Sequence, residues 1–346
     1  MRLLICLLVL ISTSLYGQTS KTYTLRTIAF YNVENLFDTE NDSLTFDDER
    51  TPEGSYHWTE ERYQQKIEHI SKVLSKIGED TSKTSPDVIG LCEVENRKVV
   101  EDLVHHPNLR NKDYGIVHFD SPDARGIDVA LLFKKSAFLP TSFKSHRLLL
   151  FDELGKRKYT RDQLVVGGML DDEEFYFIVN HWPSRRGSAA KSKPNRIRAA
   201  LLNKRIIDSV QRLNSNAKII CMGDLNDDPR DDSLKKILKT KDKAAQLDSI
   251  SLFNPMEKLY KKGLGSLAYG DKWNLFDQFF MTPNMVHGDR QEYTYWKVGI
   301  YSPSYMKTPE GKYKGYPFRS YSGGSYTGGY SDHFPVYLYL IKEKGD

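Results

Sequence analysis

Acidic, amide and histidine side chains stand at the ends of apolar runs that are typical of buried strands. Glu93 ends the run DVIGLCE, His181 follows FYFIVN directly, and Asp224 follows KIICM after a single glycine. Polar groups at strand ends converge at one edge of a sheet, where open α/β folds place their binding sites. One such Asp or Asn is most often a turn residue, but a whole series is difficult to assign to turns. The series comprises Asn32, Glu34, Glu93, His181, Asp224, Asn226, Asp277, Asp332 and His333.

These residue types suit one kind of reaction. Carboxylate and amide oxygens without thiolates favour a hard ion such as Mg²⁺, Mn²⁺ or Ca²⁺. Histidines and carboxylates can supply a base and can stabilise transition-state charge during attack on phosphorus. The chain has no Walker loop, no GxSxG elbow and no HExxH motif, which argues against an NTPase, a serine hydrolase and a zincin. The residues alone do not decide which of His181 and His333 is the base.

Short β-rich runs alternate with helical segments along the chain. The segment Thr59–Gly78 is predicted to be a helix, with apolar residues at helical spacing, Thr59 as N-cap and Gly78 as the C-terminal stop. A second helix is predicted over roughly Asn195–Leu213. Strands that are apolar on both faces and separated by helices favour an α/β layered fold. The predicted strands are Thr24–Asn32, Asp87–Glu93, Ile127–Phe133, Phe175–Asn180, Lys218–Met222, Phe276–Met281 and Pro335–Ile341.

The composition sets few limits on the partners. The chain has 346 residues, and 50 Lys and Arg against 46 Asp and Glu leave a mild charge of +4. This balance does not mark a nucleic-acid coat protein, although a local basic groove is compatible with it. Cys92 and Cys221 lie in apolar runs and are predicted to be buried free thiols.

The first residues predict export. Residues 1–17 are typical of a secretory signal, because Arg2 precedes an apolar run that is too short to span a bilayer, and small residues follow. No Pro/Ser-rich linker divides the rest of the chain, so residues 18–346 are predicted to form one domain. We expect this mature protein to be secreted or periplasmic.

Seven motifs carry a resemblance to a known family. In chain order they are FYNVENLFD, IGLCEVEN, RGIDVALLF, VNHWPSR, MGDLNDDP, FDQFF and GGYSDHFPV, and they extend from Phe30 to Val336. The chain resembles the endonuclease/exonuclease/phosphatase superfamily, which includes DNase I, AP endonucleases and bacterial sphingomyelinases. It is most similar to the exported bacterial nuclease-like members, which share NVENLFD and NHWPSR. The resemblance implies a single catalytic domain with a four-layered α/β/β/α sandwich (DNase I-like), in which two packed mixed sheets are flanked by helices.

The resemblance also implies roles for the residues at the strand ends. Glu93, Asn32 and Asp332 would hold the metal ion, expected to be Mg²⁺, with Mn²⁺ or Ca²⁺ as alternatives. His333 would act as general base on the attacking water. The other implied catalytic residues are Asp277, which would orient His333, Asp224 and Asn226, which would position water and a phosphoryl oxygen, and His181, which would donate a hydrogen bond to the scissile phosphate.

Two segments bear on the substrate. The stretch Ser184–Arg198 contains six basic residues and no acid. Arg185 and Arg186 within it, and more weakly Arg125, are therefore candidates to bind the backbone phosphates of a nucleic acid, although a solvated loop and helix face would have the same composition. The predicted loop Gln291–Tyr330 is rich in Tyr and Gly. Its aromatic rings could stack bases, anchor the protein at a lipid surface or simply pack the loop.

Three functions are compatible with these residues. The favoured one is a metal-dependent phosphodiesterase that acts as a DNA-directed or nonspecific endonuclease on a nucleic acid substrate. The alternative is a phospholipid or sphingomyelin phosphodiesterase, or an inositol or sugar phosphatase that acts on a phosphorylated small molecule. A catalytically silent binding module would need a broken motif set, but every expected position is filled. The sequence implies no protein partner.

Overall fold

The computed structural model describes residues 21–345, so the predicted secretory signal at residues 1–17 lies outside the described part of the chain. A six-stranded sheet contains, in spatial order, β16 (Thr294–Ile300), β19 (Val336–Glu343), β1 (Tyr23–Leu36), β2 (Val88–Val94), β4 (Asp128–Lys134) and β3 (Tyr114–His118). A seven-stranded sheet contains β11 (Thr240–Lys241), β12 (Leu252–Phe253), β15 (Asp277–Met281), β10 (Lys218–Asp224), β9 (Glu173–His181), β8 (Gln163–Leu170) and β5 (Phe138–His146).

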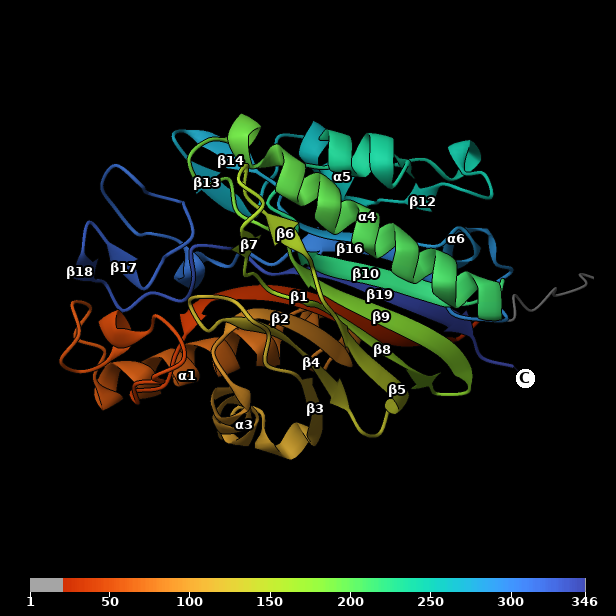
Figure 1. The fold of residues 1–346 in the computed structure, drawn as a ribbon. Coiled ribbons are helices and arrows are strands. Elements are labelled where there is room, and N and C mark those ends of the chain that lie inside the picture. Colours follow the sequence, from red (N-terminus) through yellow and green to blue (C-terminus); the bar gives the residue numbers. More distant parts are fainter. Residues whose placement is uncertain (1–20, 346) are drawn as a thin grey trace, which may run out of the picture.

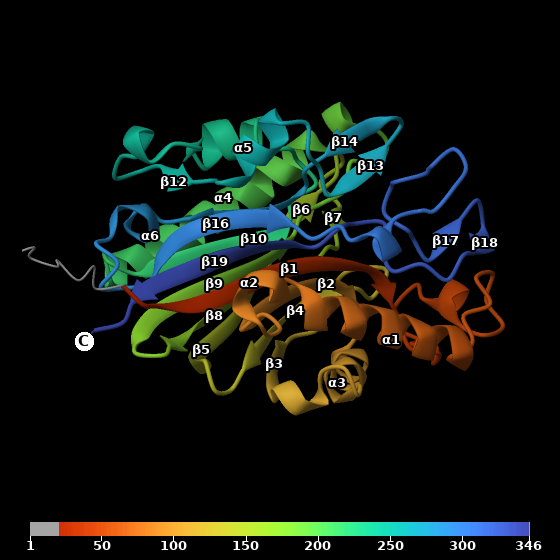
Figure 2. The ribbon, with the colours of Figure 1, turned by 180° about the vertical axis from the view of Figure 1, so that it is seen from behind.

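The two sheets pack face to face, and helices cover their outer faces (Figure 1). Both sheets are mixed, since β1 runs parallel to β2 and β9 runs parallel to β10, whereas β19 and β15 are antiparallel to their neighbours. The view from behind shows α1 against the six-stranded sheet and α4 beyond the seven-stranded sheet (Figure 2). The predicted four-layered α/β/β/α sandwich is therefore confirmed. The helices are α1 (Glu60–Lys76), α2 (Glu79–Ser82), α3 (Arg97–His105), α4 (Ala189–Leu213), α5 (Met256–Lys261) and α6 (Asn284–His287).

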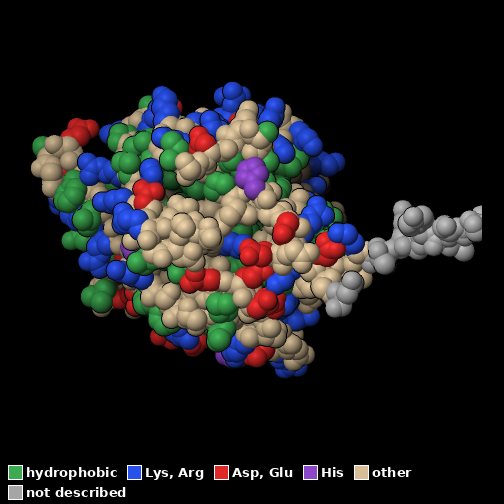
Figure 3. Space-filling model, turned by 90° about the vertical axis from the view of Figure 1, so that its right-hand side faces the viewer, with side chains coloured by type: hydrophobic (Ala, Val, Ile, Leu, Met, Phe, Trp, Pro, Cys, Tyr) green, Lys and Arg blue, Asp and Glu red, His purple; other side chains and the backbone are tan. Residues whose placement is uncertain are grey.

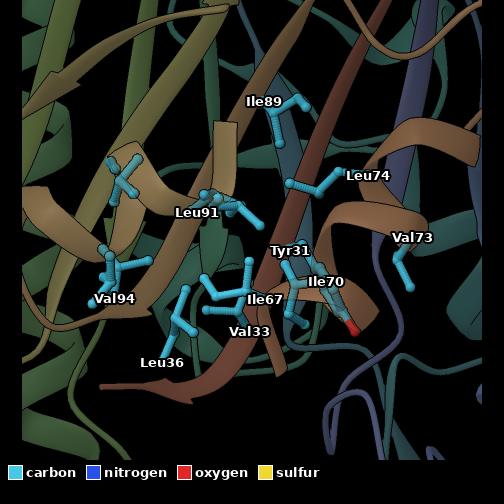
Figure 4. Close-up of a cluster of buried hydrophobic side chains, with 14 of the residues drawn as sticks. Tyr31, Val33, Leu36, Ile67, Ile70, Val73, Leu74, Ile89, Leu91 and Val94 are labelled. Atoms are coloured by element: carbon cyan, nitrogen blue, oxygen red, sulfur yellow. The ribbon is translucent and has the colours of Figure 1, made fainter. Parts of the chain in front are cut away.

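Three hydrophobic clusters hold these layers together. Because side chains alternate across a strand, Phe30 of β1 packs between the sheets, whereas its neighbour Tyr31 packs under α1. The cluster under α1 contains Ile67 and Ile70 of the helix (Figure 4). A third cluster lies under α4 and contains Trp182. Full burial of one large apolar side chain contributes about 1.5–3 kcal/mol, so each cluster is a substantial source of stability.

The sheets approach each other closely beneath the strand ends that carry polar residues. A Cβ on Gly90 of β2 would lie 2.6 Å from the sulfur of Met222 on β10. A side chain at position 90 would therefore force Met222 to shift. This close approach of β2 and β10 lies three residues before Glu93 and two residues before Asp224.

Most predicted elements are confirmed, with ends that move by a few residues. The side chain of Thr59 accepts a hydrogen bond from Arg62 N at the start of α1, as predicted for an N-cap. The predicted second helix was too short, because α4 begins at Ala189 after a Ser188 N-cap and contains Pro194 in its interior. Pro lacks a backbone N–H and is tolerated best in the first turn of a helix, so Pro194 led to a start that was predicted too late. The true first turn is capped by Ser188, whose side chain accepts from Lys191 N.

The segment Gln291–Tyr330 is not simply a loop as predicted, because it contains β16 at the edge of the six-stranded sheet and the short hairpin β17 (Tyr321–Ser322) and β18 (Ser325–Tyr326). The strand pattern is obscured there because only one side of an edge strand is paired, and most of β16 is only partly buried. Both Cys92 and Cys221 are buried and free, as predicted. Within residues 21–345, no helix is long and apolar enough to cross a membrane.

Candidate active site

Strand pairing brings the predicted polar residues into one row. On β10, Asp224 lies opposite Asp277 of the antiparallel strand β15 and opposite His181 of the parallel strand β9. In the other sheet, Asn32 of β1 lies opposite Cys92, which directly precedes Glu93. These ends of β1 and β2 lie at the same end of the molecule as Asp224 on β10, at the left of Figure 1. The convergence expected from the strand ends is therefore present.

His333 carries its own carboxylate partner. Its Nδ1 lies 2.6 Å from Asp277 Oδ2, and both side chains are buried. Burial disfavours the imidazolium, but the charge and hydrogen bond of Asp277 outweigh it, and the pKa of His333 is raised well above its ordinary value. The other ring nitrogen, Nε2, lies 3.9 Å from Asp224 Oδ2 and 3.9 Å from Asp332 Oδ1, so it points into the site.

A hydroxyl group holds the loop that carries His333. Ser331 Oγ donates to Asn32 O at 2.7 Å and accepts from His333 N at 3.1 Å. The tripeptide Ser331–His333 is thereby tied to the end of β1. This contact places the loop before β19 against the row of strand ends.

His181 lies in a different environment. Its Nε2 is 3.8 Å from Glu93 Oε1 and 3.7 Å from Asp224 Oδ2, too far for hydrogen bonds. Its buried Nδ1 has no hydrogen-bond partner among residues 21–345. Burial, with the positive charges of Arg161 and Arg125, lowers the pKa of His181 well below its ordinary value. The geometry therefore distinguishes the two histidines, which the residues alone did not: His333 is paired with a carboxylate, and His181 is neutral.

The remaining predicted residues are held by hydrogen bonds. Asp224 accepts from Asn32 Nδ2 at 3.1 Å and from Asn226 N at 2.9 Å. Burial raises the pKa of Asp224 to about 7. The side chain of Asn226 donates to Trp182 O at 3.0 Å, and Glu93 Oε2 accepts from the backbone N–H of Asn35 at 3.0 Å.

The backbone is strained at several of these residues. Glu34, Asn35, Glu93 and Asn226 have positive φ angles of 53°, 54°, 63° and 50°. Non-glycine residues adopt this left-handed region at a cost of about 1–3 kcal/mol each, and such residues cluster at functional sites.

Glu34 belongs to the site, although it was predicted only as a strand-end residue without a role. Its Oε2 accepts from Ser320 N at 2.7 Å and lies 3.8 Å from the Nζ of buried Lys66. Burial, and then the charge of Asp332, raises the pKa of Glu34 to about 7. In the sequence, the spacing Asn32-x-Glu34 at a strand end was the feature that could have indicated a role for Glu34 in the site. Nothing in the sequence singles out Lys66, which lies among the buried residues of α1.

The donor set fits a hard divalent cation. Glu34, Glu93, Asp224 and Asp332 supply carboxylate oxygens, Asn32 supplies an amide oxygen, and no thiolate is among them. Burial is the main cause of the raised pKa values of Glu34 and Asp224, and repulsion from neighbouring acids adds to it. A divalent cation would relieve this repulsion.

A second group of possible ligands lies at the start of β4. His118, Asp120 and Asp128 offer atoms within 4.8 Å of one another. Asp128 already accepts hydrogen bonds from the backbone and hydroxyl of Ser121, and Asp120 is exposed. Among residues 21–345, the acids at the strand ends do not form a group of three with ligand atoms this close together. They remain candidate ligands because of their oxygen chemistry and because Asp224 and Asp332 lie beside His333 Nε2.

The predicted substrate-binding arginines differ in their surroundings. Arg185 donates to Asn226 O at 2.8 Å and to Asp231 at 2.7 Å, so acids partly neutralise it. Arg125 reaches Asn35 Oδ1 at 3.5 Å and is half-exposed beside the site. Arg186 is exposed just before α4.

A groove of about 1140 Å³ opens beside Asp332. One wall is the hairpin formed by β13 (Leu267–Tyr269) and β14 (Lys272–Asn274). Aromatic and basic side chains line it, including Tyr269, Phe276, Lys312 and Tyr313. The groove can therefore hold a group attached to a phosphate at the strand ends.

Comparison with known proteins identifies one family and several solved structures with a similar fold. Residues 27–342 match the model of the Endonuclease/Exonuclease/phosphatase family. A Bacteroides thetaiotaomicron protein of that name has a solved structure with TM-score 0.56 and 18% identity, over 93% of this chain and 97% of that one. A humanized D. rerio TDP2 gives TM-score 0.55 and 15% identity, over 91% and 98%.

A mannosyl-6-phosphatase from Bacteroides thetaiotaomicron is similar as well, with TM-score 0.53 and 17% identity over 91% of this chain and 99% of that one. D. rerio TDP2 has also been solved with a single-strand DNA product, and that structure matches at TM-score 0.54 and 15% identity, over 92% and 99%. At these identities the likeness concerns the fold. No curated protein sequence matches the chain.

Proposed function

Since the chain belongs to the endonuclease/exonuclease/phosphatase family and is a phosphoesterase of that family, we propose that it is a metal-dependent phosphodiesterase that cleaves nucleic acid, DNA or both DNA and RNA, as an endonuclease. The observation that carries this proposal is the His333–Asp277 pair, which points Nε2 toward the carboxylate cluster beside a groove of about 1140 Å³.

Each residue has a role in the proposed hydrolysis. In its neutral form, His333 accepts the proton of the attacking water at Nε2, and Asp277 fixes the ring through Nδ1 and stabilises the imidazolium that forms. Neutral His181 donates a hydrogen bond to a phosphoryl oxygen, where charge accumulates. Asp224 and Asn226 orient the water and the phosphoryl group.

A divalent ion completes the proposed site. Glu93, Asp332 and Asn32 would hold Mg²⁺, or Mn²⁺ or Ca²⁺, with Glu34 beside them. When bound, the ion supplies positive charge that offsets the negative charge of the phosphoester. The chain's own residues do the rest by placing the water and moving its proton.

The groove supports a polymeric substrate. Exposed Tyr269 and Tyr313 can stack on bases, and Lys272 and Lys312 can contact backbone phosphates. In contrast, the end opposite the site shows acidic and basic side chains intermixed (Figure 3). Affinity for a polyanion is therefore expected to come from the groove and not from the net charge of +4.

The test is a nicking assay with supercoiled plasmid, beside single-stranded RNA. The protein with Mg²⁺ or Mn²⁺ should nick the plasmid, and EDTA or His333→Ala should abolish nicking. His287→Ala, at an exposed histidine of α6, is the matched control and should retain activity. Intact DNA and RNA under all metal conditions would refute the nuclease proposal.

A sugar phosphatase is the second candidate, because a mannosyl-6-phosphatase has a similar fold and an aromatic groove can also stack on sugar rings. Mannose 6-phosphate, an inositol phosphate and sphingomyelin vesicles should therefore be assayed beside the plasmid. Turnover of one of these with intact nucleic acid would select a phosphatase or lipid phosphodiesterase.

We further propose that residues 1–17 direct export to the periplasm or the medium and that residues 18–346 act as a single catalytic domain. The apolar run behind Arg2 is the basis for this proposal. Cell fractionation and N-terminal sequencing of the mature protein test it. Recovery of the uncleaved chain in the cytoplasm would contradict it.

A further inference from the structure

A second, smaller cavity lies beside the candidate active site. It has a volume of about 190 Å³, and its walls include Glu34, Arg50, Tyr56, Arg319 and Ser320. Arg319 also lines the large groove and donates to Asp332 at 2.7 Å, so it separates the two spaces. Pockets for drug-sized ligands have volumes of about 300–1,000 Å³. The small cavity is thus suited to a single small group next to the site.

Arg50 is the distinctive residue of this cavity. The carbon of its guanidinium lies 4.0 Å from the centre of the Tyr56 ring and 5.6 Å from that of Phe37. Within residues 21–345, no carboxylate lies within 4.0 Å of this guanidinium and no acceptor is paired with it. Arg185 and Arg319, by comparison, contact aspartates at 2.7 Å. A stacked guanidinium keeps the N–H groups on its edge available for two parallel bonds to a phosphate.

The charges around the cavity favour an anion. Arg50 and Arg319 are positive, and Lys66 lies behind Glu34 at 3.8 Å. Glu34 is the acid that lines the cavity, and its Oε2 is already held by Ser320 N. The neighbouring acids of the Arg50 segment, Asp48 and Glu49, are exposed. Lys66 at 3.8 Å and Arg319 at 4.0 Å therefore lie beside Glu34, and Arg50 lines the same cavity. The other carboxylate partner of Arg319, Asp332, belongs to the candidate active site.

We propose that the cavity binds a second phosphate group of the substrate, next to the phosphoester that is cleaved, and that Arg50 is its main ligand. This inference rests on the proposed function, because it assigns to that site a substrate with at least two phosphates. A polynucleotide offers such a neighbour at every internal bond. Arg50 is then a specificity-determining residue, since it contacts the substrate away from the bond that breaks.

The first experiment measures binding without catalysis. Thermal unfolding is followed in EDTA with increasing inorganic phosphate, because without a cation the carboxylate cluster repels anions. Phosphate should raise the Tm of the wild type and of His333→Ala, but not that of Arg50→Gln, while Arg50→Lys should keep part of the shift. An equal Tm shift in the wild type and Arg50→Gln, or no shift in the wild type, would overturn the proposal even if the protein cleaves DNA.

The second experiment compares a thymidine dinucleotide with and without a terminal 5′-phosphate. In the wild type the extra phosphate should raise kcat/KM about tenfold through KM, as expected for a charge-assisted pair. Arg50→Gln should remove this preference and leave the unphosphorylated dinucleotide unaffected. Arg212→Gln, at an exposed position at the far end of α4, is the matched control and should keep the preference.

The two experiments separate this proposal from the proposed function. Failure of the wild type to cleave either dinucleotide or the plasmid refutes the nuclease function, but the phosphate-dependent Tm shift still decides whether Arg50 binds phosphate. If Arg50→Gln instead lowers kcat/KM equally for both dinucleotides, Arg50 merely braces the aromatic residues around it, and the second-phosphate site is refuted.

Discussion

His333 and Asp277 come from opposite sheets of the sandwich and meet at 2.6 Å. His333 lies in the loop before β19 of the six-stranded sheet, and Asp277 is the first residue of β15 in the seven-stranded sheet. The pair therefore forms only when the two sheets pack against each other. The site is thus a direct product of the interface that buries Phe30, Met222 and Leu338.

The first prediction concerns Asp277. Asp277→Asn keeps the shape of this fully buried side chain but removes the charge that stabilises the imidazolium of His333. We expect kcat to fall by about 10²–10⁴-fold, the usual contribution of general base catalysis, with little change in KM. Steady-state kinetics on the substrate that the wild type cleaves are the measurement. A loss smaller than tenfold would show that Asp277 does not support the base.

The second prediction concerns the cation. Glu93→Gln keeps an acceptor for the N–H of Asn35 but removes one negative charge from the cluster. The affinity for Mn²⁺, measured by isothermal titration calorimetry, should fall at least about tenfold. Glu310→Gln changes an exposed acid and should leave the affinity unaltered. Equal affinities for the wild type and Glu93→Gln would mean that the cation binds elsewhere, with His118 and Asp128 as the next candidates.

The third prediction concerns buried Lys66. Its Nζ donates to Ser320 Oγ at 2.6 Å and to Tyr330 O at 2.7 Å. Lys66→Met leaves both acceptors without a donor and removes the positive charge 3.8 Å from Glu34, and the free energy of unfolding should fall by about 1–3 kcal/mol. Denaturant unfolding is the measurement. Lys72→Met, on an exposed face of the same helix, should cost less than about 1 kcal/mol, and a similar loss in both variants would contradict the role assigned to Lys66.

The fourth prediction concerns acid stability away from the site. Asp171 accepts from Arg26 at 2.9 and 2.6 Å and from the Tyr293 hydroxyl at 2.5 Å. Burial opposes ionisation, but these bonds outweigh it and the pKa of Asp171 is lowered. A lowered folded-state pKa contributes stability that is present above the unfolded-state value of about 3.9 and is lost as the pH falls below it. Asp171→Asn should therefore destabilise the protein at pH 7, and the difference should narrow below pH 4.

Urea unfolding of the wild type and Asp171→Asn across this pH range is the measurement. The result that decides is whether the stability difference between the two proteins narrows as the pH falls below 4. A difference between the two proteins that stays constant from neutral to acid pH would mean that the charge of Asp171 contributes nothing to stability.

The sequence alone predicted buried strands that alternate with helices and polar residues at the strand ends, and its resemblance to a known family implied the four layers. Buried strands are continuous apolar runs, and a polar residue directly after such a run lies at the end of its strand, at the edge of the sheet. The positions of Glu93, His181 and Asp224 follow from this local rule, whereas Asp277 begins its strand. The helix α1 was equally predictable, because its apolar spacing and its Thr59 cap are local properties.

Only the tertiary structure shows which of these side chains pair with one another. Asp277 pairs with His333 and not with His181 because β15 faces the loop before β19, a relationship across 56 residues of chain. The proximity of Lys66 to Glu34, and of Arg50 to the ring of Tyr56 beside the same acid, likewise depends on how α1 and the Asp48–Arg50 turn lie against the sheet edge. Spacing along the chain reports which side of an element a residue occupies, but pairing between side chains depends on distances that exist only after the layers have packed.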